Sequence, residues 1–316
     1  MTLKDWTPSL STIGAAALAY FAVQFTRQAA VYILPCQLKR YNQSGTNWAL
    51  VTGATDGIGF GFCEELCARG FNVILHGRSA SKLDQRAREL RAAYPDRKTG
   101  IIVLDVVGAG QAVNQVAAQV QAITDEHGGR LTVLVNNVGG ETKPFTALDM
   151  LSFADAQATI DRNLGFLTHI TRVLLPLLAG KGRSGLVLNV SSFSAYGLPF
   201  ITVYSATKGY VDTFTRALEA ECLARQYGVE VLGLRVGQVR TSGFAVGSGA
   251  FVPNGRMMAK AGLNRVGCGQ VIVWGYFWHW IQGAAFDILP RWMLMKASSK
   301  KMSALKKETE ELLKKS

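Results

Sequence analysis

Tyr204 and Lys208 are the pair of side chains best suited to proton transfer. They are four residues apart in a segment with a helical pattern, so both lie on one face of the helix. Hydride reduction of a ketone needs a proton donor for the developing alkoxide, and a phenol can be that donor. The ordinary pKa of a phenol is about 10, and a neighbouring ammonium group lowers this pKa. The pair indicates acid–base chemistry at a carbonyl group, although such residues can also share a helix face without a joint role.

Ser191 and Ser192 end an apolar run that reads as a strand. A hydroxyl group at the carboxyl end of a strand faces the crevice where α/β proteins bind ligands. Such a group can donate a hydrogen bond to a substrate carbonyl and polarise it. The alternative is a polar strand end that only caps the next turn.

A glycine-rich turn follows the short apolar run of residues 49–51. Gly53, Gly57 and Gly59 form the turn, and residues 60–69 read as a helix. Glycines let the backbone approach a pyrophosphate, and the helix N-terminus offers free N–H groups and a positive dipole. The spacing is Gly-x3-Gly-x-Gly, not Gly-x-Gly-x-x-Gly. Taken alone, the turn could also be an ordinary strand–helix connection.

The elements that must position these residues alternate along the chain. Strands are predicted at residues 48–51, 72–75, 100–104, 132–135, 185–190 and 229–236, and helices at 59–69, 81–94, 111–126, 151–178 and 202–227. This alternation predicts parallel strands joined by crossover helices. Nearly continuous apolar strands fit a sheet that is buried on both faces. We therefore predict an α/β fold with a Rossmann-type doubly wound parallel sheet.

Composition and charge limit the classes of binding partner that the protein can have. The 316 residues are 48% hydrophobic and carry a net charge of +12. Seven lysines and three glutamates lie within residues 296–316, and the other basic residues are scattered. This distribution excludes a nucleic-acid-binding surface and suits acidic substrates or an anionic membrane. The five cysteines are irregularly spaced, so neither a disulfide framework nor a metal site is indicated, and a reducing compartment is expected.

Residues 10–34 are apolar and are interrupted by Arg27 and Gln28. A membrane span needs about 20 apolar residues, so this segment is either a marginal span or an amphipathic helix in the interface. Lys39 and Arg40 follow it, which places the rest of the chain in the cytosol. A cleaved signal peptide is the alternative.

Four regions are expected from these patterns. They are an apolar membrane-anchor segment (1–40), a linker (41–46), a Rossmann domain (47–270) and an aromatic, lysine-rich C-terminal segment (271–316). Residues 244–258 read as a mobile loop or short helices. Residues 271–295 form either a core helix or a membrane-interface segment, because tryptophan is enriched at such interfaces. Residues 298–316 read as a charged helix.

The combined motifs resemble those of the short-chain dehydrogenase/reductase family, in order and spacing, from residue 47 to about 241. The motifs are Thr52-Gly-Ala-Thr-Asp-Gly-Ile-Gly59, Asn136-Asn-Val-Gly139, Asn163, Ser191-Ser192 and Tyr204-x3-Lys208. The resemblance implies that Tyr204 is the general acid/base and that Lys208 binds the nicotinamide ribose. It also implies that Asn163 holds a water of a proton relay. The family's carbonyl-polarising serine corresponds to Ser192 by motif position or to Ser191 by ungapped spacing, and both remain candidates.

The resemblance also implies a nicotinamide cofactor, and no acidic residue follows the second strand to bind the ribose of NAD. Arg78 is there instead and can pair with a 2′-phosphate, so NADP(H) is expected. The remaining expected cofactor-binding residues are Gly53, Thr55, Asp56, Gly57, Ile58, Gly59, Asp105, Asn136, Gly139, Val239 and Thr241. Asp56 departs from the basic residue of many NADP-dependent relatives, and Val236-Gly237 replaces the usual Pro-Gly.

Within the family, the chain is most similar to membrane-bound very-long-chain 3-oxoacyl-CoA reductases and related 17β-hydroxysteroid dehydrogenases. This implies NADPH-dependent reduction of a lipophilic ketone at the cytosolic face of the endoplasmic reticulum membrane, with a homodimer as a further expectation. Residues 243–265 are the segment where such enzymes diverge. Two alternatives remain: a reductase of another hydrophobic ketone, for example in secondary metabolism, and a non-catalytic membrane-anchored scaffold.

Overall fold

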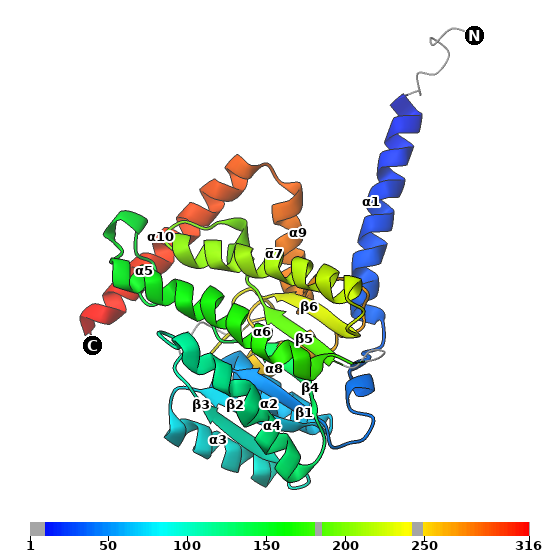
Figure 1. Cartoon of the computed structure of the whole chain (residues 1–316). Coiled ribbons are helices and arrows are strands. Elements are labelled where there is room, and N and C mark those ends of the chain that lie inside the picture. Colours follow the sequence, from blue (N-terminus) through cyan, green and yellow to red (C-terminus); the bar gives the residue numbers. More distant parts are fainter. Residues whose placement is uncertain (1–9, 181–184, 242–248, 316) are drawn as a thin grey trace.

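A parallel β-sheet forms the centre of the computed structural model, which describes residues 10–180, 185–241 and 249–315. Seven strands of this described part pair in the order β3-β2-β1-β4-β5-β6-β7 (Figure 1). They are β1 (Trp48–Thr52), β2 (Asn72–Gly77), β3 (Thr99–Val103), β4 (Leu131–Asn136), β5 (Gly185–Val190), β6 (Val229–Arg235) and β7 (Ile272–Trp274). Every pairing is parallel.

Helices cover both faces of the sheet. One face carries α2 (Gly57–Ala68), α3 (Ala80–Ala93) and α8 (Gly255–Leu263), and the other carries α4 (Val116–His127), α6 (Phe166–Leu178) and α7 (Thr202–Ala224). The strands contribute side chains to two separate cores, because successive side chains of a strand point to opposite faces of the sheet. Ala49 and Val51 join the first core, and Leu50 joins the second. The predicted Rossmann-type doubly wound sheet is confirmed.

The strand order reverses between β1 and β4, which pair directly. The helices that follow these two strands cover opposite faces, so a crevice opens at their carboxyl ends. The glycine turn follows β1 at this point, and the Asn136-Asn-Val-Gly139 motif follows β4. The topology thus brings together two distant motifs, and Asn137 of the second bonds Thr52 of the first across 85 residues of chain.

Two predicted helices are interrupted. Residues 151–178 form α5 (Phe153–Ile160), a π-helical turn η5 (Asp161–Gly165) and α6. Residues 111–126 begin with a 3-10 turn, η3 (Gly110–Gln115), before α4. Further 3-10 turns are η2 (Leu38–Tyr41), η4 (Leu148–Met150) and η6 (Phe193–Tyr196). A π-turn widens the helix by one residue and often marks a functional site; here it carries Asn163.

Helix α1 (Leu10–Ile33) extends away from the body of the molecule, and only its carboxyl end packs on it (Figure 1). Val31 is buried, the Tyr32 hydroxyl donates to the carbonyl oxygen of Trp274 at 2.9 Å, and the rings of Phe25 and Trp280 lie 5.5 Å apart. In the part of the chain that the structure describes, no helix is both long enough and apolar enough to cross a membrane.

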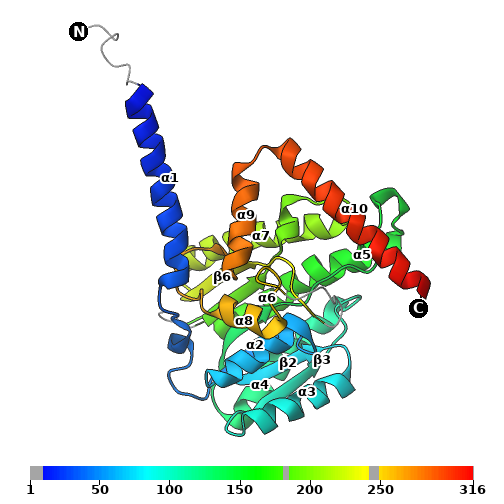
Figure 2. The ribbon, with the colours of Figure 1, turned by 180° about the vertical axis from the view of Figure 1, so that it is seen from behind.

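The C-terminal segment contributes to the fold beyond residue 270, the predicted end of the Rossmann domain. Strand β7 pairs with β6 and adds the last strand of the sheet. Helix α9 (Phe277–Ile288) follows it, and α10 (Arg291–Lys315) then runs back across the molecule (Figure 2). Trp274 and Trp280 are buried, whereas Trp292 is 70% exposed. The aromatic segment is therefore partly core and partly surface.

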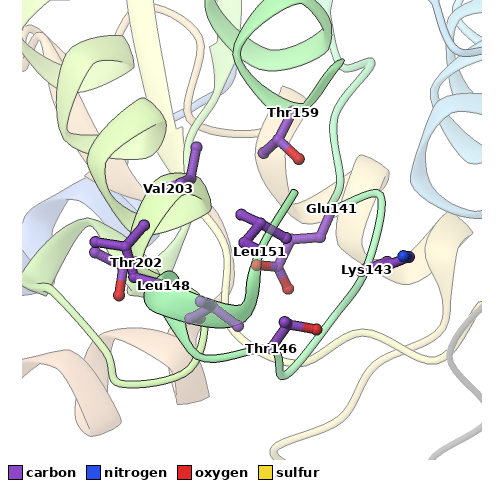
Figure 3. A pocket seen from close by; sticks show the side chains of 9 residues that line it. Glu141, Lys143, Thr146, Leu148, Leu151, Thr159, Thr202 and Val203 are labelled. Carbon is purple, nitrogen blue, oxygen red and sulfur yellow. The ribbon is translucent and has the colours of Figure 1, made fainter. Parts of the chain in front are cut away.

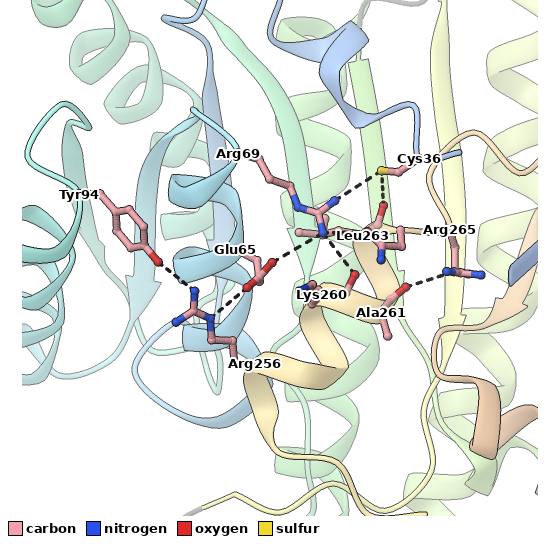
Figure 4. Close-up of polar contacts among 10 residues, drawn as sticks. Cys36, Glu65, Arg69, Tyr94, Arg256, Lys260, Ala261, Leu263 and Arg265 are labelled. Carbon is pink, nitrogen blue, oxygen red and sulfur yellow. Dashed lines mark hydrogen bonds and ion pairs between the residues drawn. The ribbon is translucent and has the colours of Figure 1, made fainter. Parts of the chain in front are cut away.

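Helices α2 and α8 pack closely, and polar contacts fasten them together (Figure 4). Arg256 Nε donates to Glu65 Oε1 at 3.0 Å, and Arg69 Nη2 donates to Asn264 Oδ1 at 2.9 Å. A Cβ atom on Gly255 would lie 2.2 Å from the carbonyl oxygen of Gly57, so only glycine permits this approach. Helix α8 thereby supports the amino end of α2, which begins at the glycine turn. Cys63 and Cys67 are buried free thiols within α2, as expected.

Candidate active site

Helix α7 carries Tyr204 and Lys208 in its first two turns, beside the carboxyl end of β5. Lys208 is 3% exposed, and its Nζ donates to the carbonyl oxygen of Val190 at 2.8 Å. The same Nζ lies 5.6 Å from the centroid of the half-buried Tyr204 ring. The helix and the strand end therefore hold a phenol and an ammonium group side by side.

Burial dominates the protonation of both groups. It raises the pKa of Tyr204 to about 12, while the hydroxyl groups of Ser192 and Ser194 counteract this rise and the charge of Glu141 adds to it. Burial lowers the pKa of Lys208 to about 8, and the carboxylate of Asp212 opposes that change. The expectation that Lys208 lowers the pKa of Tyr204 is not met, because loss of hydration outweighs any gain from the ammonium group. The phenol stays protonated and is suited to donate a proton.

The two adjacent serines point to different places. Ser192 lies near enough to the Tyr204 phenol for its hydroxyl to lower the phenol pKa, and its Oγ accepts a hydrogen bond from the Ser194 N–H at 3.1 Å. Ser191 is 1% exposed, and its hydroxyl donates to the carbonyl oxygen of Lys208 at 3.3 Å. The structure therefore brings Ser192, and not the hydroxyl of Ser191, to the phenol.

Asn163 holds the loop that follows β4. Its Nδ2 donates to the carbonyl oxygens of Gly140 and Thr159, both at 2.8 Å, and its Oδ1 accepts from the Gly140 N–H at 3.0 Å. Both side-chain donors are therefore used within the protein, and the role of Asn163 in a proton relay stays a prediction. A Cβ atom on Gly139 would lie 2.9 Å from Asn163 Oδ1 and 3.1 Å from Lys208 Nζ. The backbone of Gly139 thus packs closely against both groups and leaves no room for a larger side chain.

The glycine turn is shaped as a cradle. Gly53 and Gly57 have φ values of +66° and +56°, in the left-handed region that favours glycine. A Cβ atom on Gly59 would lie 2.0 Å from the carbonyl oxygen of Gly53. Asp56 and Ile58 stand at the start of α2, and Thr55 lies against Gly77 at the end of β2. The three glycines therefore let the turn close tightly ahead of the N-terminus of α2, where a phosphate group can bind.

Asn136 was expected to line the adenosine side, and the structure corrects this prediction. Its side chain is 2% exposed and donates to Thr171 Oγ1 and Asn189 Oδ1, both at 2.8 Å, so it cannot reach a ligand. Its neighbour Asn137 is the residue at the cradle and donates to the carbonyl oxygens of Thr52 and Gly53 at 3.0 and 3.4 Å. Successive residues of a strand face opposite sides, and this separates the two asparagines.

A second arginine joins Arg78 at the far end of the crevice. Phe166 stacks on His76 of β2 at 4.9 Å, which brings Arg162, one turn before Phe166, to the end of that strand. The pKa of Arg162 is lowered by burial and by the charge of Arg78, while Asp105 acts in the opposite direction. Neither guanidinium group has a hydrogen bond or ion pair with another described residue. Arg78 and Asp105 are expected here from the sequence, whereas Arg162, which adjoins Asn163, is not.

The segment after β6 completes the crevice. Thr241 lies over the glycine turn, because a Cβ atom on Gly57 would be 2.7 Å from its Cγ2, whereas the side chain of Val239 is buried in the core. His279 of α9 accepts from the Gly237 N–H at 3.1 Å, and its other ring nitrogen lies 3.2 Å from the carbonyl oxygen of Gln238. His279 thus holds the Val236-Gly237 loop, and no local sequence signal marks it. Residues 242–248 of the expected divergent loop lie outside the described residues.

The model of the short chain dehydrogenase family matches residues 47–246. The very-long-chain 3-oxoacyl-CoA reductase of Caenorhabditis elegans is 30% identical over 296 residues, covering 88% of this chain and 87% of the relative. The enzyme of the same name from Anas platyrhynchos is 34% identical over 250 residues, covering 77% and 76%.

Solved structures show the same fold. A 7β-hydroxysteroid dehydrogenase aligns with a TM-score of 0.67 at 20% identity and covers 83% of this chain and 99% of its own. A short-chain dehydrogenase from Streptomyces avermitilis aligns with a TM-score of 0.53 at 33% identity, covering 64% and 69%. The chain therefore belongs to the short-chain dehydrogenase family and is an oxidoreductase acting on CH–OH and C=O groups.

Proposed function

We propose that the protein reduces a lipophilic ketone to a secondary alcohol with NADPH, and that its substrate is a long-chain or very-long-chain 3-oxoacyl-CoA. The observation that carries the proposal is the arrangement of a protonated Tyr204 phenol between the Ser192 hydroxyl and the Lys208 ammonium group. This set combines a proton donor, a carbonyl-polarising group and a cation beside a dinucleotide-type crevice.

The residues of the crevice fit a nicotinamide dinucleotide. The glycine cradle at the amino end of α2 suits the pyrophosphate, and Lys208, which lies beside Gly139, suits the ribose. Arg78 and Arg162 supply two cations where a 2′-phosphate would lie, and this supports NADP(H) over NAD(H). When bound, the nicotinamide supplies the hydride.

The protein's own groups carry the remaining steps. The Ser192 hydroxyl donates a hydrogen bond to the ketone oxygen and polarises the C=O bond. During the reduction Tyr204 gives its proton to that oxygen, so the product is a neutral alcohol and the phenolate is reprotonated from solvent. Lys208 stabilises the transient phenolate. Asn163 positions the loop of Gly139 and Gly140 against Lys208.

The substrate class rests on the relatives, which are named very-long-chain 3-oxoacyl-CoA reductases, and on the net charge of +12, which suits an acidic CoA group. A steroid-like ketone is the second candidate, supported by the likeness in fold to a hydroxysteroid dehydrogenase. We further propose attachment to the cytosolic face of the endoplasmic reticulum membrane and assembly as a homodimer. Exposed apolar side chains on α1 support the attachment.

The proposal is tested by NADPH oxidation with the purified full chain and a panel of ketones. We expect turnover of 3-oxoacyl-CoA substrates, and a loss of at least about a thousandfold in Tyr204→Phe with NADPH binding retained. Full activity of Tyr204→Phe would refute the proposed chemistry. Binding of NADPH without turnover of any ketone by the wild-type chain would support the scaffold alternative.

A further inference from the structure

Glu141 is an acidic side chain placed beside the reaction site. It follows Gly139 and Gly140 in the loop after β4, two residues beyond the glycine that packs beside Lys208. Its side chain lines a small pocket between this loop and the first turn of α7, together with Leu148, Leu151, Thr159, Ile201, Thr202 and Val203 (Figure 3). The pocket therefore adjoins the turn that carries Tyr204.

The carboxyl group of Glu141 is half-buried and has no hydrogen bond or ion pair within the described residues. Lys143 lines the same pocket, but its Nζ lies 3.1 Å from Asp155 Oδ2 of α5, so its charge is already paired. Tyr204 and Lys208 are the titratable groups in the first two turns of α7, and the charge of an ionised Glu141 would raise the pKa of Tyr204. Burial raises the pKa of Glu141 to about 8, so the carboxyl group is mostly neutral at pH 7.

A neutral carboxyl group has one O–H donor. In a site where Ser192 and Tyr204 bind the ketone oxygen, a further donor nearby suits a second oxygen on the same substrate. An ionised carboxylate would instead select an amine, and burial without a cationic partner opposes that state. The surroundings of Glu141 favour the neutral donor.

We propose that Glu141 is a substrate-binding residue whose carboxyl group donates a hydrogen bond to a second carbonyl oxygen of the substrate, close to the ketone that is reduced. The inference rests on the proposed ketone reduction and specifies the substrate as a dicarbonyl compound. The site then discriminates a 3-oxoacyl thioester from a simple ketone by one directed hydrogen bond.

The test compares two substrates in four forms of the full chain. The substrates are a 3-oxoacyl-CoA and a 2-alkanone of the same chain length, and the readout is the ratio of their kcat/KM values. Glu141→Leu removes the donor, and we expect the ratio to fall about tenfold, as for the loss of one hydrogen bond. Glu141→Gln retains an N–H donor and keeps the ratio within about threefold of wild type. Asp149→Leu is the control, an exposed acid of the same loop, and should leave the ratio as in wild type.

The pH dependence is a second readout. In wild type the ratio should fall as the pH rises through about 8, because the ionised carboxylate no longer donates, and Glu141→Gln should remove this fall. An unchanged ratio in Glu141→Leu, or an equal fall in both Glu141 variants, would overturn the inference. Turnover of the 2-alkanone without turnover of the 3-oxoacyl-CoA would also overturn it and leave the ketone reductase intact. No turnover of either would refute the proposed function itself.

Discussion

Ser191 and Ser192 show that two identical neighbouring side chains can have separate roles. Ser191 is the last buried residue at the end of β5 and bonds the backbone of α7, whereas Ser192 turns toward the phenol. We expect Ser192→Ala to lower kcat for ketone reduction by about a hundredfold, because one polarising hydrogen bond to the carbonyl is lost. Steady-state NADPH oxidation measures this effect.

Ser191→Ala is the matched control for that prediction. It removes one buried hydroxyl that bonds Lys208, so it should cost about 1 kcal/mol of unfolding free energy and leave kcat within about threefold of wild type. A hundredfold loss of kcat in Ser191→Ala, with Ser192→Ala active, would reverse the assignment.

Arg78 and Arg162, at the end of β2, lead to a prediction about the preference for NADPH over NADH. A charge-assisted hydrogen bond contributes roughly 1.5–3 kcal/mol, so Arg78→Ala should weaken NADPH binding by about 10- to 100-fold. Arg162→Ala should weaken it less, by about fivefold, because Arg162 is partly buried. Neither variant should alter NADH binding, since NADH has no 2′-phosphate. Fluorescence titration gives both dissociation constants.

Arg88→Ala is the control, an exposed arginine on α3. Equal losses of NADH and NADPH affinity in Arg78→Ala would mean that the arginine supports the fold and not the phosphate.

At the scale of residues, local spacing predicted which side chains act together, whereas the tertiary placement of single side chains could not be predicted from the sequence. The separation of Tyr204 and Lys208 and the spacing of the glycine turn are local patterns, so both could be predicted from the sequence. Asn136 could not be told from Asn137, because strand alternation decides which side chain is buried. Glu141 has no motif, and only the packing of its loop against α7 brings it to the site.

At the scale of elements, the strand–helix alternation predicted the sheet and most helix positions. The π-turn η5 could not be predicted, because it is one extra residue within a continuous helical pattern. Strand β7 has three residues and lies inside an aromatic segment, so its composition indicated helix or interface. Pairing with β6 decides its conformation, and this is a contact between distant parts of the chain.

His279 of helix α9 leads to a prediction about how the stability of the fold depends on pH. This imidazole is fully buried, and burial lowers its pKa below the ordinary value of 6.5. The unfolded chain binds a proton below about pH 6.5 and the folded chain does not, so stability is lost as the pH falls from about 6.5. His76 acts in the same direction, because burial lowers its pKa to about 4. We expect the thermal unfolding midpoint to decrease steadily between pH 6.5 and 4.

His279→Gln separates the contribution of α9 from that of His76. Glutamine cannot titrate, so the decrease in the midpoint below pH 6.5 should become shallower. At pH 7.5 the variant should be less stable by about 1 kcal/mol, because the Gly237 N–H loses its acceptor. Identical pH profiles for wild type and variant would show that His279 does not set the acid sensitivity.

At the scale of the whole molecule, two apolar features project from the same end. Helix α1 and the turn between α9 and α10 both extend from that end in the two opposite views (Figures 1 and 2). Leu18 and Phe21 of α1 are 73% and 64% exposed, and Ile288 and Trp292 at the turn are 77% and 70% exposed. Exposed apolar side chains gathered in this way are typical of surfaces that meet a membrane or another protein. Both features could therefore rest on one lipid surface.

We expect the full chain to sediment with lipid vesicles, and both projecting features to contribute. Two variant pairs test this: Leu18→Glu with Phe21→Glu on α1, and Ile288→Glu with Trp292→Glu at the turn. Each pair adds charge to a surface that would leave water, so each should lower the vesicle-bound fraction by about tenfold or more. Leu223→Glu, an exposed apolar residue of α7 that is 73% accessible, is the control and should bind as wild type does. Because all four positions lie outside the crevice, turnover of a water-soluble ketone should persist. If the turn variants bind vesicles as wild type does, α1 alone forms the contact; if neither pair changes binding, the apolar end meets another protein instead.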